Sequence, residues 1–502
     1  MSKIINMLKK KNPEQQTGAV TCIVVGAGSR GGTYAAYAQH YPDRMRVVGL
    51  AEPREYQRNQ IKERNNVPSS NVFTDWHEAV ERDKFADCVI ITTVDRDHKD
   101  PAVAFAKKGY NILLEKPMAV TEADCREIVK TCKQHNVCLA VCHVLRYVPW
   151  ARKIKEVIAS GRIGEVVNIH HTEPVGFWHF AHSFVRGNWR NASESSNSLL
   201  AKCCHDVDLI KYWFGETRCL KVASFGNLTH FTKADKVGFW HFPHAFVRGN
   251  WRNEEESCNS LLGKCCHDVD LIKCWMGEKK CQRISSFGNV SHFRKGDKPK
   301  GAASRCMDCP QKIETSCPYS AKRYYLDEVK SGNRGWPVSV IADVPDIESV
   351  TEALKTGPYG RCVYECDNDV MSHQVVNFQF EGGSTASLTM VAFTKKVCQR
   401  EVKVYGTRGE ISCVDDGIRV FDFLSGQTTT ESLKVDEFAR RWGHGGADYH
   451  LIHTFVTAIK ENNPELIETG ADDTLNSHLL VFAAEKAHKE NCVVTINPDG
   501  TF

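Results

Sequence analysis

A strand, a glycine-rich turn and a helix follow one another near the start of this chain, and this order constrains the fold most strongly. The apolar run from Ala19 to Val25 leads into Gly26-Ala27-Gly28-Ser29-Arg30-Gly31 and then a helical stretch from Thr33 to His40. Gly26 permits a tight turn, Gly28 lets a pyrophosphate approach the backbone, and Gly31 lets helix and strand pack closely. The segment predicts a dinucleotide-binding α/β unit whose helix N-terminus, with Ser29, faces the phosphates.

The identity of the dinucleotide depends on the next strand, Arg46 to Leu50, which leads to Glu52 about 26 residues after the first glycine. An acidic side chain at this point accepts hydrogen bonds from ribose hydroxyls, which favours NAD over NADP. NADP remains the less favoured alternative, because the guanidinium of Arg30 or Arg54 could meet a 2′-phosphate.

Two further apolar runs end in polar residues. The run Ala86 to Thr93 opens into Val94-Asp95-Arg96-Asp97-His98, and the run Tyr110 to Leu114 leads to Glu115-Lys116-Pro117. Open α/β sheets bind ligands at the carboxyl ends of their strands. We therefore predict cofactor contacts from Thr93, Asp95, His98 and Glu115, and proton chemistry from Lys116. A lysine with its usual pKa of about 10.4 is an acid at neutral pH, so a base role needs burial or a nearby positive charge.

These motifs together resemble the glucose-fructose oxidoreductase and inositol dehydrogenase (Gfo/Idh/MocA) family. The resemblance rests on the glycine turn, Glu52, the Thr92-Thr93-x-Asp95-x-x-His98 loop and Glu115-Lys116-Pro117, and it covers nearly the whole chain from about residue 18. It implies a Rossmann domain joined to a second α/β domain, and oxidation or reduction of sugars or cyclitols with NAD(P). It also implies that Lys116 is the acid/base residue beside the nicotinamide. The alternative for Lys116 is an exposed lysine without a chemical role.

The second half of the chain also resembles this family. A helix from Trp150 to Ser160 precedes a glycine turn and the strand Glu165 to His170. Alternating segments typical of antiparallel strands occur later, at Val375 to Phe380, Ala386 to Val391 and Glu401 to Tyr405. We expect an α/β fold: a flexible tail (1–17), an N-terminal Rossmann domain with a parallel sheet (18–146), and a C-terminal α/β domain with a largely antiparallel sheet (147–502) that makes a homo-oligomer.

A tandem duplication interrupts the second domain. Residues 175–236 recur as 237–298, with 44 of 62 positions identical. Two copies are too few for a solenoid, and both cannot occupy one position in the sheet. The extra unit either packs as an added lobe, or two alternative exons have been read in series, which is the interpretation we favour. Copy two replaces Ala181 by Pro243, Tyr212 by Cys274 and Phe214 by Met276, so the copies would shape different pockets.

Each copy carries a helix with the sequence Lys-Cys-Cys-His-Asp-Val-Asp-Leu-Ile, which places His205 in copy one and His267 in copy two. The helix resembles the family's substrate-domain helix, which implies that one of these histidines is the second catalytic group; the alternative is a core histidine. Asp208 lies three residues after His205 on one helical face, so its carboxylate can influence the imidazole. Many members carry an aspartate four residues before the histidine, but this chain has Ala201 and Gly263 there.

The second domain is rich in His, Trp, Arg and Asn side chains, which suit a sugar ring. Aromatic faces and bidentate donors would fit a sugar, although they also fit other polar ligands. Gly443-His444-Gly445-Gly446-Ala447-Asp448, which precedes a helix from Tyr449 to Glu461, suggests a substrate loop or a plain helix start capped by Asp448. The candidate substrate residues are Arg146, Tyr147, His182, Arg186, Trp189 and His444.

The cysteines and the overall charge exclude several other classes. Cys306, Cys309 and Cys317 resemble a zinc knuckle without a fourth ligand at a fitting spacing, so we expect no metal. The 22 cysteines lie mostly in apolar segments, which favours buried reduced thiols. A net charge of +4 without a basic stripe gives no nucleic-acid signal. Without a long apolar run or an apolar leader, we expect a cytoplasmic protein with no membrane partner.

Three functions remain open from the sequence. In the leading interpretation, an NAD(P)-dependent dehydrogenase, Lys116 exchanges a proton with a sugar or cyclitol hydroxyl while the carbinol hydrogen leaves as hydride. The first alternative is an NAD-dependent glycosidase that oxidises a glycoside, eliminates the aglycone and reduces the ring again. The second is an inactive nucleotide-binding or scaffold protein, which the duplication and the missing aspartate favour and the intact Lys116 disfavours.

Overall fold

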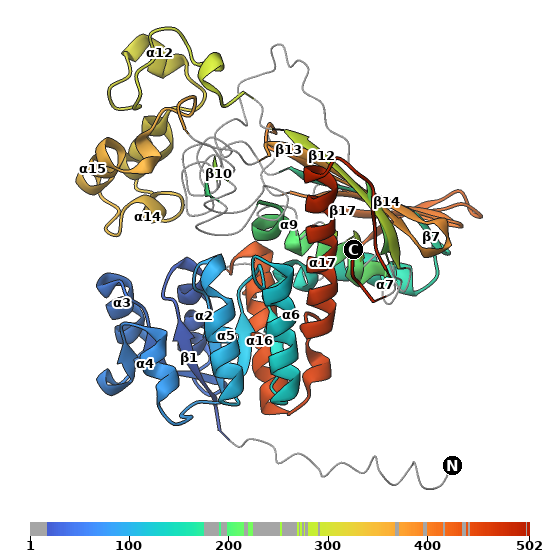
Figure 1. Ribbon diagram of the computed structural model, residues 1–502, viewed down its shortest axis with the longest axis horizontal. Helices are drawn as coiled ribbons and strands as arrows, with labels where there is room; N and C mark the ends of the chain where they lie inside the picture. The colour runs from blue at the N-terminus through green and yellow to red at the C-terminus, as the bar shows by residue number, and fades with distance from the viewer. Residues whose placement is uncertain are drawn as a thin grey trace.

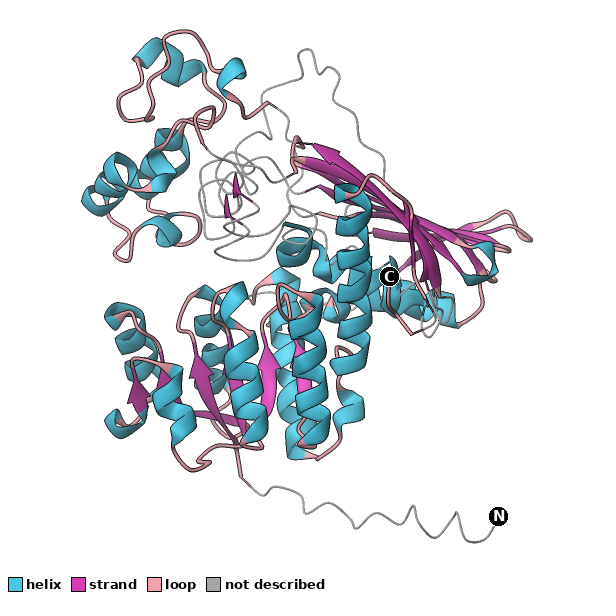
Figure 2. Ribbon diagram, in the orientation of Figure 1, coloured by secondary structure: helices cyan, strands magenta, loops and turns pink. Residues whose placement is uncertain are grey.

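The chain folds around two β-sheets, one parallel and one largely antiparallel, and helices cover both faces of the parallel sheet (Figure 2). The computed structural model describes residues 18–174, 190–191, 198–214, 219–223, 252–253, 269–270, 272–273, 276, 280–289, 292–366, 371–394, 399–414, 417–433, 438–439, 442–497 and 499–502. The two sheets agree with the fold class expected from the sequence.

The parallel sheet is the core of the first domain. Its strand order, 3-2-1-4-5-6, places the glycine turn at the middle of the sheet, where the order reverses and such sheets bind ligands. The three central strands are apolar and buried, as parallel strands covered on both faces must be. In sheet order the strands are β3 (Val72–Phe73), β2 (Met45–Ala51), β1 (Val20–Val25), β4 (Cys88–Ile91), β5 (Asn111–Leu114) and β6 (Leu139–Val141).

The helices between these strands follow the expected crossover pattern. The first helix starts at Ser29 rather than Thr33, so the last glycine of the motif, Gly31, already lies in its first turn. Another helix, α6, begins at a threonine, Thr121, whose hydroxyl accepts the Asp124 N–H as an N-cap. The helices are α2 (Ser29–His40), α3 (Glu55–Asn65), α4 (Trp76–Glu81), α5 (Lys99–Lys107) and α6 (Glu122–Gln134).

The second sheet has ten strands, and all described neighbours pair antiparallel except β14 with β7. Its central strand β13 alternates buried and half-buried residues, as the alternating sequence predicts. In sheet order the strands are β12 (Cys281–Asn289), β19 (Val494–Thr495), β9 (Cys219–Ala223), β13 (His373–Phe380), β14 (Thr385–Val391), β7 (Val166–Pro174), β15 (Glu401–Gly406), β16 (Gly409–Val414), β17 (Gly417–Asp422) and β18 (Thr428–Glu431).

Two C-terminal helices return to the first domain. In Figure 1, α16 (Ala447–Lys460) and α17 (Ala471–Lys489) stand beside the Rossmann helices, where α16 contacts α2 and α17 contacts α6. The N–H of Val141 donates to the carbonyl of Thr469 just before α17. The second domain therefore shares its last helices with the first, so a boundary at residue 146 separates the sheets but not their cores.

Between the sheets and beyond them lie the remaining helices. The segment η3 (Val144–Tyr147) and helix α7 (Pro149–Ala159) lead into β7, and α9 (Ser198–Phe214) lies against η3 and α17. A lobe of short helices, α12 (Gln311–Ser316), α13 (Asp327–Lys330), α14 (Val338–Ile341) and α15 (Ile347–Thr356), projects from the body in Figure 1. Among the described helices, none combines the length and the apolar character that a bilayer crossing requires.

Candidate functional site

The glycine turn has the geometry that a dinucleotide needs. Gly26 has φ +91°, and a Cβ on Gly31 would lie 2.0 Å from the carbonyl oxygen of Gly26, so neither position accepts a side chain. Helix α2 begins directly after Gly28 without a side-chain cap. Its first N–H groups are thus available to a phosphate, where the helix dipole also favours negative charge. The turn therefore fits the pyrophosphate of NAD.

Glu52 lies at the carboxyl end of β2 beside this turn. Its carboxylate accepts the N–H of Ala27 at 2.6 Å and the Nε of Arg54 at 2.7 Å. Burial alone would raise the pKa of Glu52, but the hydrogen bonds from Arg54 and Ala27 outweigh burial and lower it. An ionised carboxylate suits ribose hydroxyls and repels a 2′-phosphate. The geometry thus favours NAD, and the guanidinium of Arg54 is already paired with Glu52.

The loop after β4 contacts the segment that follows β5 and carries Lys116, here called the lysine loop. His98 is fully buried, and its Nδ1 lies 2.7 Å from the carbonyl oxygen of Pro117 while its Nε2 lies 3.1 Å from that of Thr93. Burial lowers the pKa of His98, so the ring is neutral and donates its single N–H to one of the two carbonyls. Asp95 is also buried. Contacts of Thr93, Asp95 and His98 with the cofactor stay predictions.

Lys116 is held at the end of β5 by the residue before it. The N–H of Lys116 donates to Oε2 of Glu115 at 2.7 Å. The other oxygen of Glu115 accepts the Nε of Arg30 at 2.6 Å and the hydroxyl of Tyr34 at 3.1 Å. With both oxygens engaged inside the protein, Glu115 fixes the backbone that carries the lysine, and a direct contact with the cofactor stays a prediction.

Arg30 connects this loop to helix α16. Its guanidinium binds Asp448 with two bonds, of 2.9 and 2.8 Å, in addition to its bond to Glu115. Burial alone would raise the pKa of Asp448, but Arg30 and His444 lower it well below its usual value. Nδ1 of His444 lies 3.1 Å from the same carboxylate. Arg30 thus spans two carboxylates, which supports a role in positioning Lys116; its contact with the cofactor, considered above for a 2′-phosphate, stays a prediction.

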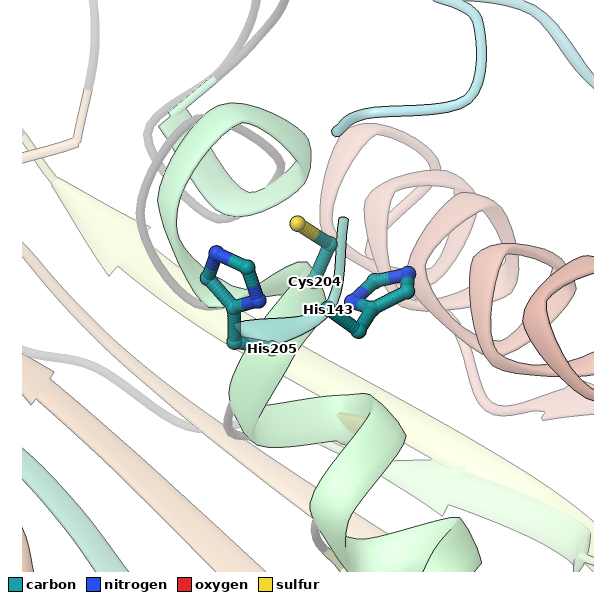
Figure 3. A group of neighbouring side chains, drawn as sticks. All are labelled: His143, Cys204 and His205. Atoms are coloured by element: carbon teal, nitrogen blue, oxygen red, sulfur yellow. The ribbon is translucent and has the colours of Figure 1, made fainter. Parts of the chain in front are cut away.

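Helix α9 brings His205 to the same edge from the second domain. Figure 3 shows His205 and Cys204 on this helix with His143 close by, and the rings of His143 and His205 lie 5.3 Å apart, centroid to centroid. Burial lowers the pKa of His205 well below its usual value, and the charges of His143, Arg400, Lys116 and His444 lower it further. The imidazole of His205 is therefore neutral and within electrostatic reach of Lys116.

His478, on helix α17, fixes the other side of the lysine loop. The N–H of Met118 donates to Nε2 of His478 at 3.0 Å, and Nδ1 of His478 donates to the carbonyl of Thr474 at 2.9 Å. This pair of bonds defines one neutral tautomer. Burial lowers the pKa of His478 to about 3, with a smaller contribution from Lys116. The lysine loop is thus bonded to the last helix of the chain.

Asp208 does not act on His205 as the sequence suggested. Its carboxylate forms an ion pair with Arg146, and Asp270 of copy two lies 3.0 Å from the same guanidinium. The carboxylate of Asp208 is therefore paired with Arg146. Arg146 and Tyr147 are almost completely buried, so holding α9 is the role that the geometry supports for Arg146. Contact of either residue with a substrate stays a prediction.

Several expected site residues lie outside the described residues: His182, Arg186, Trp189 and His267. Their roles stay predictions. Two histidines that were not predicted from the sequence, His143 and His478, lie in the same group of side chains as Lys116 and His205. His143 follows β6 at the same carboxyl edge as Lys116, and this position could have identified it. His478 lies in the middle of a helix and has no local signal.

His143, Cys204 and His205 also have the spacing of metal ligands, with ligand atoms within 4.8 Å of one another. Cys204 is disulfide-bonded, however, and a disulfide sulfur is not the thiolate that zinc binds. Cys281 is disulfide-bonded too, which corrects the expectation of reduced thiols at these two positions. Most other described cysteines are reduced and buried, such as Cys22, Cys88 and Cys142.

The site as a whole combines a lysine with the neutral imidazoles of His205 and His478, and a neutral imidazole can accept or donate hydrogen bonds. Lys116 comes from the parallel sheet, His143 from the segment after it, and His205 and His478 from the helices that face it. The dinucleotide turn lies on the same carboxyl edge. This arrangement can bind a hydroxyl-bearing ligand next to a nicotinamide ring.

Comparison with known sequences agrees with this site. Residues 20–143 match the GFO_IDH_MocA oxidoreductase family, NAD-binding Rossmann fold, and residues 155–224 match its C-terminal alpha/beta domain. An uncharacterized oxidoreductase of Streptococcus pneumoniae serotype 4 is 30% identical over 207 residues, and 2,7-anhydro-N-acetylneuraminate hydratase of Escherichia coli is 28% identical over 207 residues. Each alignment covers 41% of this chain and 53% of the relative, so the chain spans about half the length of these relatives.

Comparison with solved structures extends over the whole fold. Levoglucosan dehydrogenase, solved with NADH and L-sorbose, is similar with a TM-score of 0.59 and 14% sequence identity. The match covers 96% of this chain and 99% of that chain. At this identity the likeness supports the two-domain fold and nothing finer.

Proposed function

Because the chain belongs to the Gfo/Idh/MocA family of oxidoreductases, we propose that it transfers hydride between NAD and a CH–OH group of a sugar or cyclitol. The observation that carries the proposal is that Lys116 lies within electrostatic reach of the buried imidazole of His205, whose pKa it helps to lower, at the sheet edge that also carries the glycine turn. Relatives and structural neighbours that act on or bind sugar-like molecules support the substrate class.

Bound NAD would supply the hydride acceptor. Lys116 gives a proton to the substrate oxygen in the reducing direction and takes it in the oxidising direction. The bond from its N–H to Glu115 fixes the lysine backbone, and Arg30 and Tyr34 fix Glu115 in turn. These contacts hold the backbone that carries the lysine and leave Glu115 out of the proton transfer itself.

His205 would bind the same hydroxyl from the second domain. Since its pKa is lowered by burial and by neighbouring positive charge, the ring stays neutral at physiological pH. A neutral imidazole can accept a hydrogen bond from a hydroxyl or donate one to a carbonyl. It can therefore hold both the alcohol and the ketone form of a substrate without adding a second positive charge next to Lys116.

The test uses the purified full chain with NAD and a panel of sugars and cyclitols. We expect NADH absorbance to rise with at least one of them, and the reverse reaction to consume NADH when a ketose is supplied. A chain that binds NAD but changes neither cofactor form nor substrate would contradict the proposal and favour a nucleotide-binding protein without turnover.

A second candidate function follows from the E. coli relative, whose name describes a hydratase. Net addition of water involves no net oxidation, so in such a family the cofactor would be reduced and reoxidised within one turnover. The same protein would then change a glycoside or anhydrosugar without accumulating NADH. Chromatography of the sugar products, alongside NADH absorbance, separates this function from a dehydrogenase. Homo-oligomerisation stays a prediction that light scattering tests.

A further inference from the structure

The strands of the two copies have the same partners. In copy one, Val222 of β9 pairs with Phe378 of β13 and with Val494 of β19. In copy two, Ile284 of β12 pairs with the same two residues. Ile284 is the equivalent of Val222, 62 positions later, so the registers are identical. Because β14 covers the other edge of β13, and a residue offers one N–H and one C=O to a ladder, both strands compete for one edge.

The helices of the two copies also share their partners. Arg146 contacts Asp208 of copy one and its equivalent Asp270 of copy two, and the hydroxyl of Ser477, which has one hydrogen to donate, lies within hydrogen-bonding distance of both carboxylates. The N–H of Met276 in copy two lies 3.2 Å from the carbonyl oxygen of Ile210 in copy one and 3.1 Å from that of Ile272, the equivalent of Ile210. The helices and the strands thus indicate independently that the two copies compete for the same position.

We propose that the two copies are alternative occupants of one position in the fold. The copy that occupies this position, here called the seated copy, supplies the helix and strand that face Lys116. This inference rests on the proposed function for its catalytic part. With copy one seated the histidine is His205; its equivalent in the sequence of copy two is His267, which lies outside the described residues. The seated copy also changes the packing on Arg146, whose guanidinium lies 5.4 Å from the ring centroid of Tyr212, where copy two has Cys274. The copies would therefore prefer different substrates.

A double-mutant cycle in the full chain tests the shared position. We expect Asp208→Asn or Asp270→Asn alone to leave the denaturation midpoint nearly unchanged, because the other copy supplies the carboxylate to Arg146. The double variant should lower the midpoint by far more than the sum of the two. The matched control is Asp297→Asn, which removes the same charge from an exposed residue of copy two. Additive shifts would overturn the proposal.

Two deletions test the catalytic part. Removing 175–236 or 237–298 leaves 440 residues (502 − 62) and the same residues at both junctions. We expect both variants to unfold cooperatively, to gain thermal stability with NAD, and to rank the panel sugars differently. Loss of folding in either variant, with an intact full chain, would overturn the shared position. Two folded, NAD-binding variants without turnover would contradict the proposed function alone.

Discussion

The first domain and the duplicated segment reach the candidate site from opposite sides. They differ in whether a functional position has one candidate residue or two. Each functional position of the Rossmann domain has a single residue: one glycine turn, one Glu52, one Lys116. The position of α9 has two candidates in the sequence, and Asp208 and Asp270 already share Arg146. Substitutions in the first region therefore have no replacement, whereas those in the second have one.

The largest expected effect is at Lys116. Replacing Lys116 by Ala removes the proton donor that no other residue duplicates, and we expect turnover to fall by about 10²–10⁴-fold, the usual contribution of a general acid or base. The thermal midpoint and NAD affinity should change little. Lys107→Ala, at the exposed end of α5, is the control. Turnover that survives in Lys116→Ala would show that the lysine has no acid/base role.

The histidines of the duplicated segment should behave differently. We expect His205→Ala or His267→Ala alone to lower turnover by less than about tenfold, and the double variant by about 10²-fold or more, as for a lost acid–base or orienting group. Steady-state kinetics of the three variants measures the difference. If His205→Ala alone abolishes turnover, only copy one is seated and the comparison with Lys116 disappears.

Asp448 tests a buried ion pair outside the duplication. Asp448→Asn leaves the guanidinium of Arg30 without its main partner, and we expect the free energy of unfolding to fall by about 2–3 kcal/mol, below the full cost of a completely buried pair because Arg30 is partly exposed. Chemical denaturation measures it. The control is Asp472→Asn, whose exposed pair with Lys133 should be worth less than about 1 kcal/mol. Equal losses of unfolding free energy in the two variants would show that Arg30 does not act as a positioning residue.

The pH dependence of stability gives the smallest effect per residue. The pKa values of His205 and His478 are lowered by burial, so the unfolded chain binds protons below about pH 6.5 that the folded chain does not. Stability should therefore fall as the pH decreases through this value, by about 1.4 kcal/mol per histidine between pH 7.5 and 5.5. Denaturation at both pH values measures the loss. His478→Gln should remove its share, whereas His205→Gln should remove less if His267 replaces it.

Much of the first domain could be predicted because its signals are local. The strand, glycine turn and helix form a continuous segment, and each central strand is an apolar run followed by its polar loop. The length of the helix was less predictable, because the glycines that usually mark a turn lie inside the first turn of α2. The apolar run before Lys116 located it at the edge of the sheet, and the family resemblance implied its acid/base role.

The partners of these residues could not be predicted, because they come from distant parts of the chain. Arg30 pairs with Asp448, 418 positions later, and Met118 bonds to His478, 360 positions later. His478 has no neighbouring motif, and the glycine-rich segment that ends at Asp448 predicts a loop or a helix start but no arginine partner. Such pairings depend on how the sheets face each other, which the local sequence does not encode.

The bond between His478 and the N–H of Met118 has a consequence for how the protein is made. The lysine loop is synthesised well before α17, because 360 positions separate Met118 from His478. A nascent chain can fold the parallel sheet long before the loop after β5 acquires its final hydrogen bonds. Catalytic competence should therefore arise only after α17 has been synthesised, and a ribosome stalled before residue 478 would display a folded domain with an unfinished active site.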